Sequence, residues 1–72
     1  MIGENEIITF ANGKRFNVIH SFMMDGINYV FLYEDGNPKN VMYMKFVNEE
    51  LIPIVDEEEL KKYYEKLKED LL

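Results

Sequence analysis

The sequence predicts an α+β fold, an antiparallel β-meander of four to five strands with one C-terminal amphipathic helix packed on one face. Three observations predict it. Two residue pairs suited to tight turns, Asn12-Gly13 and Asp25-Gly26, follow one another at hairpin spacing. The stretches beside them are rich in β-branched and aromatic residues, which favour strands. Beyond residue 55 the apolar residues change to a helical spacing.

The turn residues divide the first part of the chain into strands. A type I′ hairpin turn needs positive φ at both central residues, which Asn-Gly and Asp-Gly tolerate. We expect a longer loop at residues 35–40, because Pro38 lacks an N–H donor and restricts the residue before it. Pro53 favours an edge position for the last strand. The expected strands are 7–11, 14–24, 27–34, 41–47 and 51–55.

The C-terminal segment has the pattern of an amphipathic helix over residues 57–71. Its apolar side chains form one stripe, at intervals of three and four residues. The stripe consists of Leu60, Tyr63, Tyr64, Leu67 and Leu71. Asp56 is a suitable N-cap, and Glu59, three residues later, completes the pattern of a capping box. We expect the stripe to pack on the sheet.

Length and composition predict one small domain spanning residues 1–72, with strands over about residues 6–55 and the helix over about residues 57–71. The sequence contains no cysteine, and the residues after Met1 lack the basic and apolar regions of a signal peptide. No apolar run approaches the roughly 18 residues that a membrane helix needs. We therefore expect a cytoplasmic protein that contacts no membrane.

The formal net charge of −6 is concentrated near the C-terminus, where residues 49–72 contain nine acidic residues and four lysines. Direct nucleic-acid binding is not expected, because phosphate neutralisation requires clustered Lys and Arg. The acidic segment is predicted to be a solvated helix face. The alternative is a docking surface for a basic partner.

The turn positions also predict which side chains share a face of the sheet. Two-residue loops at both turns would fix the strand register. The expected cross-strand pairs are Ile7–Val18, Thr9–Phe16, Val18–Tyr33, His20–Phe31 and Phe22–Tyr29. The face predicted to lie under the helix then carries Ile7, Phe16, Val18, His20, Phe22, Tyr29, Phe31 and Tyr33.

The opposite face is predicted to hold a second apolar set among its polar residues. This set is Ile8, Phe10, Ile19, Val30 and Leu32. One helix covers only one face of a small sheet, so two outcomes stay open. Either the five residues form an exposed interaction patch, most simply for a second copy of the chain in a homodimer, or the sheet curls and buries them inside.

No group of residues predicts a catalytic, cofactor-binding or metal site. His20 is the only histidine, and its sequence neighbours supply no carboxylate to orient it as a general base. The acids at 57–59 point about 100° apart on a helix, so they do not converge on one substrate. The segment from Asp35 resembles the start of a calcium loop, but its twelfth position is Phe46 instead of glutamate. We expect no enzyme, no cofactor and no metal ion.

One segment carries a family resemblance. Residues 50–60, with the sequence ELIPIVDEEEL, resemble the end of the YrzB-like family, the domain of unknown function 1292. The resemblance extends over nearly the whole chain through the apolar runs at 8–10, 16–19 and 29–33. The chain lacks the long acidic insert that family members often carry between the third and fourth strands. The resemblance implies a small, acidic bacterial protein of this fold in the cytosol, and it implies no activity and no catalytic residue.

The sequence therefore predicts a non-enzymatic protein-interaction or regulatory module with an unidentified protein partner. Two alternatives stay open, an acidic mimic that inhibits a nucleic-acid-binding protein and an enzyme without a recognisable site. A mimic needs acids spread over one surface at phosphate-like spacing, whereas here the acids cluster at one end among lysines. An enzyme needs a pocket with convergent polar groups.

Overall fold

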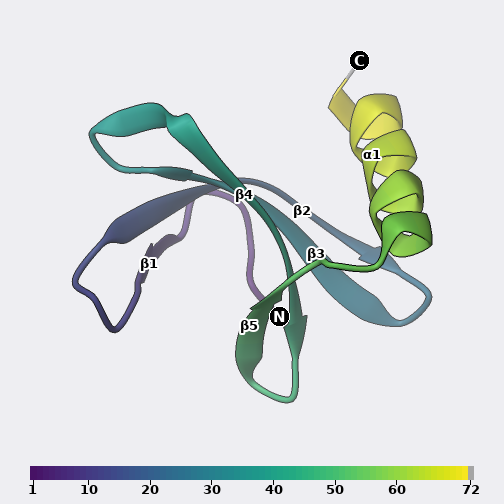
Figure 1. The fold of residues 1–72 in the computed structure, drawn as a ribbon, viewed down its shortest axis with the longest axis horizontal. Coiled ribbons are helices and arrows are strands. Elements are labelled where there is room, and N and C mark those ends of the chain that lie inside the picture. Colours follow the sequence, from purple (N-terminus) through teal and green to yellow (C-terminus); the bar gives the residue numbers. More distant parts are fainter. Residues whose placement is uncertain (72) are drawn as a thin grey trace.

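The computed structural model describes residues 1–71 and contains a five-stranded antiparallel sheet and one helix (Figure 1). Strands adjacent in sequence are adjacent in the sheet, so the sheet is a meander. The predicted α+β fold is therefore confirmed. The elements are β1 (Ile7–Thr9), β2 (Arg15–Met24), β3 (Ile27–Glu34), β4 (Asn37–Val47), β5 (Glu50–Pro53) and α1 (Glu57–Leu71).

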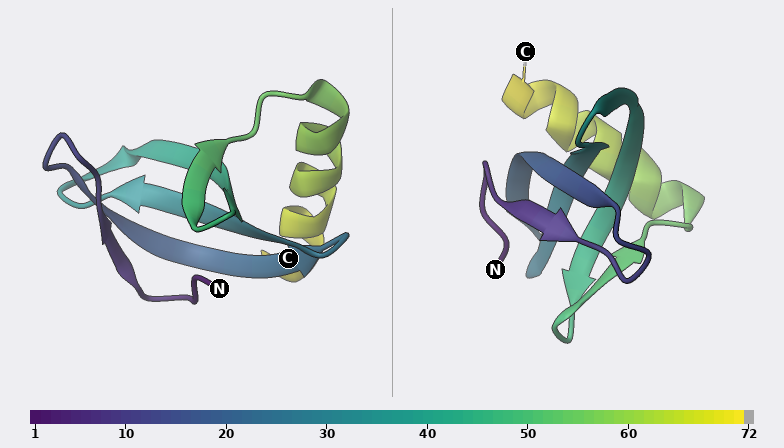
Figure 2. Two further views of the ribbon diagram at one scale, coloured as in Figure 1. Left: turned by 90° about the horizontal axis from the view of Figure 1, so that it is seen from below. Right: turned by 90° about the vertical axis from the view of Figure 1, so that its left-hand side faces the viewer.

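The sheet is strongly twisted and curled, and α1 lies on one side of it, near the β2–β3 hairpin (Figures 1 and 2). The hairpin turn is the predicted type I′ turn, because φ is 52° at Asp25 and 76° at Gly26. Met24 and Ile27 pair directly beside it. Phe22 pairs with Tyr29, as expected.

The first hairpin differs from the prediction by one residue. Of the predicted turn pair, only Gly13 has positive φ, at 85°. The Phe10 N–H donates to the Lys14 carbonyl (2.9 Å), and the Gly13 N–H donates to the Phe10 carbonyl (2.9 Å). The loop therefore has three residues with glycine in the left-handed position, which is a common alternative to the two-residue turn. The longer loop places Ile8 opposite Phe16, where Thr9 was expected.

The predicted long loop at residues 35–40 is also wrong. Asp35 and Gly36 form a tight turn between the paired residues Glu34 and Asn37, and β4 begins at Asn37. The next β3–β4 pair is Tyr33 with Val41, so residues 38–40 have no partner on β3. Proline is tolerated in such an irregularity, because no ladder hydrogen bond is lost there.

A β-bulge at Ile19 changes the faces of β2. His20 pairs with Phe31 as predicted, but Val18 pairs with Leu32 where Tyr33 was expected. Ile19 is the extra residue between these two pairs. Since side chains alternate along a strand, one extra residue places the side chains before it on the face opposite to the one that regular alternation predicts. The prediction that Val18 shares a face with His20 is therefore wrong.

The face under α1 holds one core cluster. Its buried members are Phe22, Tyr29, Ile54, Tyr63 and Leu67. Tyr63 is fully buried, and its hydroxyl donates a 2.8 Å hydrogen bond to the Val30 carbonyl. The helical stripe is narrower than predicted, because Tyr64 is 42% exposed and Leu71 is 49% exposed.

The opposite face holds a second core cluster. Its buried members are Phe16, Val18, Val30, Leu32 and Met44. Residues from the N-terminus, the first hairpin, β4 and β5 pack against this cluster: Ile2, Ile8, Phe10, Met42 and Leu51. The curled sheet therefore covers its second face with its own margins. Phe16 and Val18, predicted to lie under the helix, belong to this second cluster.

The buried Asn28 side chain fixes the N-terminal segment on the second face. Asn28 is 5% exposed, and its Oδ1 accepts a 2.8 Å hydrogen bond from the Ile2 N–H. Its Nδ2 donates to the Ser21 hydroxyl (2.9 Å), and that hydroxyl in turn donates to the Ile2 carbonyl. Within residues 1–71, no buried side-chain polar atom lacks a hydrogen-bond partner. Both polar groups of the Ile2 backbone are thus satisfied as Ile2 covers the cluster.

The helix begins where the sequence predicts. The Asp56 Oδ2 accepts a 2.9 Å hydrogen bond from the Glu59 N–H, so Asp56 is the N-cap. The reciprocal contact of a capping box is absent from the described residues, because the Glu59 carboxylate instead bonds to side chains of the sheet. Glu59 is therefore used to attach α1 to the strands.

We predict that Leu67→Ala lowers the free energy of unfolding by about 2–4 kcal/mol, because a large buried side chain is truncated in a packed site. Val55→Ala is the control, since Val55 is 85% exposed. Chemical denaturation of both variants measures the difference. An unchanged unfolding midpoint for Leu67→Ala would show that α1 is not docked through this residue.

We predict opposite outcomes for a glutamate placed at Leu32 and at Ile19. Leu32 is fully buried and Ile19 is 38% exposed. The core of a domain of this size supplies roughly 3–5 kcal/mol of stability, and burying an unpaired carboxylate costs more than that. Leu32→Glu therefore abolishes the folded state in circular dichroism, and Ile19→Glu keeps it. A folded Leu32→Glu protein contradicts the two-sided core.

Candidate functional site

The predicted interaction patch is not an exposed surface. Val30 and Leu32 are fully buried, and Ile8 and Phe10 are half-buried against the same core cluster. Ile19 alone of the five is exposed, at the bulge. Of the two outcomes left open by the sequence, the structure has the second, in which the sheet curls and buries most of these residues.

A row of aromatic rings leads from the sheet to the exposed side of α1. Phe31 and Tyr43 lie on neighbouring strands and stack, with ring centroids 5.5 Å apart. Tyr43 meets Tyr64 edge to face, with centroids 5.1 Å apart and planes at 85°. Offset and edge-to-face contacts are the favourable geometries for aromatic pairs. Tyr64 is thus held in a fixed orientation although much of its ring faces solvent.

Tyr64 forms one wall of an apolar groove along the last two turns of α1. The groove has a volume of about 530 Å³ and is lined by Tyr64, Leu67, Lys68 and Leu71. We call these four residues the α1 groove. Within the described residues Lys68 forms no ion pair, and it is the only charged group of the lining. Three of the four residues belong to the apolar stripe that the sequence predicts to pack on the sheet.

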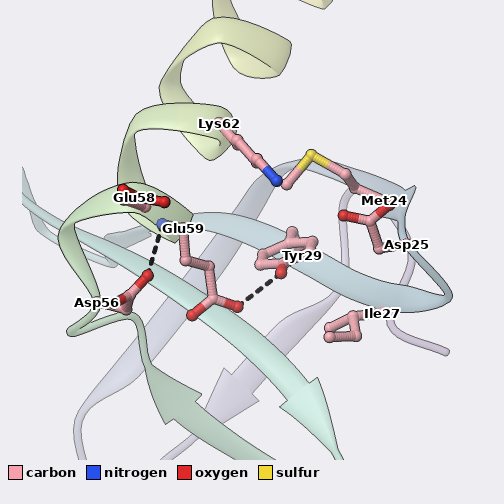
Figure 3. Close-up of a pocket in the computed structure, with 8 residues that line it drawn as sticks. All are labelled: Met24, Asp25, Ile27, Tyr29, Asp56, Glu58, Glu59 and Lys62. Atoms are coloured by element: carbon pink, nitrogen blue, oxygen red, sulfur yellow. Dashed lines mark hydrogen bonds between the residues drawn. The ribbon is translucent and has the colours of Figure 1, made fainter.

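A second cavity lies at the start of α1. It has a volume of about 330 Å³ and is lined by Met24, Asp25, Ile27, Tyr29, Asp56, Glu58, Glu59 and Lys62 (Figure 3). The Tyr29 hydroxyl donates a 2.6 Å hydrogen bond to Glu59, and Lys45 Nζ lies 2.9 Å from both Glu59 oxygens. The Glu59 carboxylate therefore bridges β3, β4 and α1.

These contacts define the protonation states at the cavity. The Lys45 ammonium, and then the Tyr29 hydroxyl, hold the pKa of Glu59 below its usual range. Burial, together with the Glu59 carboxylate, raises the pKa of Tyr29 well above its usual range. Glu59 is thus a paired carboxylate and Tyr29 a neutral donor. Neither has the unsatisfied, poised character of a general base.

His20 lies between two carboxylates. Its Nδ1 is 2.7 Å from Glu4 Oε1, and its Nε2 is 3.0 Å from Asp70 Oδ2. The sequence predicts only the cross-strand partner Phe31. The two carboxylates are 16 and 50 residues away in sequence, and no local pattern connects them to His20.

Within residues 1–71, no group of three or more His, Cys, Asp or Glu side chains has the arrangement of a metal site. In the same part of the chain, no helix has the length and hydropathy needed to cross a membrane.

Comparison of the chain with family models, with curated proteins and with solved structures finds no match. The resemblance to the YrzB-like family therefore stays a prediction. The candidate sites are defined by the geometry of this chain alone.

We predict that Glu59→Gln reduces the acid sensitivity of the fold. A carboxyl whose pKa is lowered by folding stabilises the protein above its unfolded-state pKa, near 4.5, and loses that contribution as the pH falls. Unfolding midpoints are compared between about pH 7 and about pH 3. The wild type should lose more stability than Glu59→Gln over this range. Glu58→Gln, which changes a neighbouring carboxylate without these contacts, should behave as the wild type, and equal losses in all three proteins would contradict the prediction.

Proposed function

We propose that this protein is a non-enzymatic protein-interaction module that binds an apolar segment of a partner protein in the α1 groove. The observation that carries the proposal is the groove itself, in which half-exposed Tyr64 and Leu71 flank the buried Leu67. Partly exposed aromatic and aliphatic side chains around a packed floor are typical of the central contacts in protein interfaces.

The charge of the groove specifies the partner further. Among the residues that the structure describes, Lys68 is its only charged lining residue, so a partner with large apolar side chains next to a carboxylate fits it best. The net charge of the whole chain is −6, which opposes an acidic partner at long range. Charges further apart than about 8 Å are largely screened at physiological salt. The local charge of Lys68 therefore decides the preference.

The ionisable clusters support a role other than catalysis. Both oxygens of Glu59 contact Lys45, and both ring nitrogens of His20 face carboxylates. These groups attach α1 and the N-terminal segment to the sheet. A catalytic acid or base instead needs a position within reach of a substrate proton.

The sequence also bears on the family, the cellular location and the alternative functions of the protein. The junction at residues 50–60 supports membership of the YrzB-like family, and the cysteine-free sequence supports a cytoplasmic location. The interleaving of acids and lysines on α1 disfavours an acidic mimic of nucleic acid. A homodimer through Ile8, Phe10, Ile19, Val30 and Leu32 is not proposed again, because this set is largely buried.

We predict that the peptide acetyl-Leu-Leu-Asp-amide binds the α1 groove more tightly than acetyl-Leu-Leu-Lys-amide. Titration of ¹⁵N-labelled protein should shift the amide resonances of Tyr64, Leu67, Lys68 and Leu71. An exposed opposite-charge pair contributes up to about 1 kcal/mol and a like-charge pair costs a similar amount, so the difference in Kd should be at most about thirtyfold.

Two charge-reversal variants make the test specific. Lys68→Glu should invert the preference between the two peptides. Lys61→Glu changes the net charge equally but lies outside the groove lining, so it should leave the preference unchanged. Equal binding of both peptides, or resonance shifts located elsewhere on the protein, would contradict the proposal.

A further inference from the structure

We propose that His20, in its doubly protonated form, is a pH-dependent clamp that joins the N-terminal segment and the last turn of α1 to β2. This inference rests on the contacts of His20 and is independent of the proposed binding function. It assigns a conformational role to the single histidine of the sequence.

The clamp brings together three parts of the chain. Glu4 precedes β1, His20 lies in β2, and Asp70 lies in the last turn of α1. The two carboxylate oxygens approach different ring nitrogens, at 2.7 Å and 3.0 Å. The His20 side chain is 15% exposed, the Asp70 side chain 22% and the Glu4 side chain 52%, so the Asp70 contact is the better shielded of the two.

The protonation state follows from the donor count. A neutral imidazole has one N–H and one unprotonated nitrogen, so it donates to only one carboxylate and presents a lone pair to the other. An imidazolium donates from both nitrogens. Two carboxylate acceptors on opposite sides of the ring therefore match the charged form, and deprotonation breaks one of the two contacts and removes the charge from the other.

The surroundings of His20 contain few competing charges. From α1, Lys66 Nζ lies 3.1 Å from the other oxygen of Asp70 and shares that carboxylate. From β3, the residue opposite is Phe31, and on β2 the Phe22 ring lies 5.8 Å from the imidazole. Within the described residues, Glu4 and Asp70 are the charged groups in contact with His20.

The direction of the pKa changes agrees with this geometry. The hydrogen bond to Asp70 raises the pKa of His20 above 6.5, burial opposes it, and Glu4 raises it further. The contacts with His20 and then Lys66 hold the pKa of Asp70 below its usual range. A raised histidine pKa means that the clamp stabilises the fold fully below the unfolded-state pKa and is lost as the pH rises through the folded-state pKa.

Release should affect the two joined segments unequally. The N-terminal segment is also held by the Ile2–Asn28 hydrogen bond and by the Asn5 N–H, which donates to the Val18 carbonyl (3.0 Å). Beyond the buried Leu67, the described part of α1 is attached to the sheet by the Asp70 contact with His20, while Leu71 is exposed. The last turn of α1 is therefore the part that loosens when His20 loses its proton.

The test is an NMR titration of the His20 ring proton, which is unambiguous because the sequence has one histidine. We expect a pKa above 6.5 in the wild type. Asp70→Asn should lower it more than Glu4→Gln, since the Asp70 contact is the larger cause. Glu69→Gln removes a neighbouring carboxylate that does not touch His20, so it should leave the pKa unchanged. A wild-type pKa at or below 6.5, or a pKa insensitive to both contact variants, overturns the proposal.

Amide hydrogen exchange then tests the conformational consequence. Protection factors, corrected for the intrinsic pH dependence of exchange, should fall at residues 68–71 as the pH rises through the measured His20 pKa. His20→Gln keeps a polar side chain that does not titrate, so its protection factors there should be independent of pH. Protection that stays constant in the wild type, or falls equally in His20→Gln, would show that the contacts do not act as a clamp.

Discussion

The extra residue that β2 carries at Ile19 determines which side chains meet on each face of the sheet. Before the bulge, Phe16 and Val18 face the second core cluster, and after it, His20 and Phe22 face α1. Without this bulge all four would lie on one face, since side chains alternate along a strand. The bulge therefore divides the apolar residues of β2 between two cores, and a bulge also increases local twist, as the curled sheet requires.

Two cores are a demanding arrangement for 72 residues, because a small domain buries a modest fraction of its surface. One face of the sheet is covered by the helix, and the other face is covered by the margins of the sheet itself. Asn28 and Ser21 allow the N-terminal segment to complete the second face, since Asn28 accepts from the Ile2 N–H and Ser21 donates to the Ile2 carbonyl, and these groups would otherwise be buried without a partner. The buried hydroxyl of Tyr63 is likewise satisfied under α1, because it donates a hydrogen bond to the Val30 carbonyl.

Charged groups attach both ends of α1 to the sheet. Glu59 joins the first turn to Tyr29 and Lys45, and Asp70 joins the last turn to His20. Apolar packing by Tyr63 and Leu67 lies between them. His20 and Glu59, which the sequence offers as candidates for acid–base chemistry, thus both form contacts that join elements of the fold. Most of the exposed side of α1 is charged, and its apolar part is the α1 groove, which is why a binding role in that groove is the better supported proposal.

The sequence by itself determined the features that depend on neighbouring residues. Asp25-Gly26 specified its turn, Asp56 specified the helix start, and the apolar stripe specified the helix, because turn geometry and capping involve residues within four positions of each other. Only the tertiary structure decided the bulge at Ile19, the burial of Val30 and Leu32, and the partners of His20. A one-residue register shift reverses the faces of a strand while leaving the local pattern unchanged. Glu4 and Asp70 meet His20 only after the sheet has curled and α1 has docked.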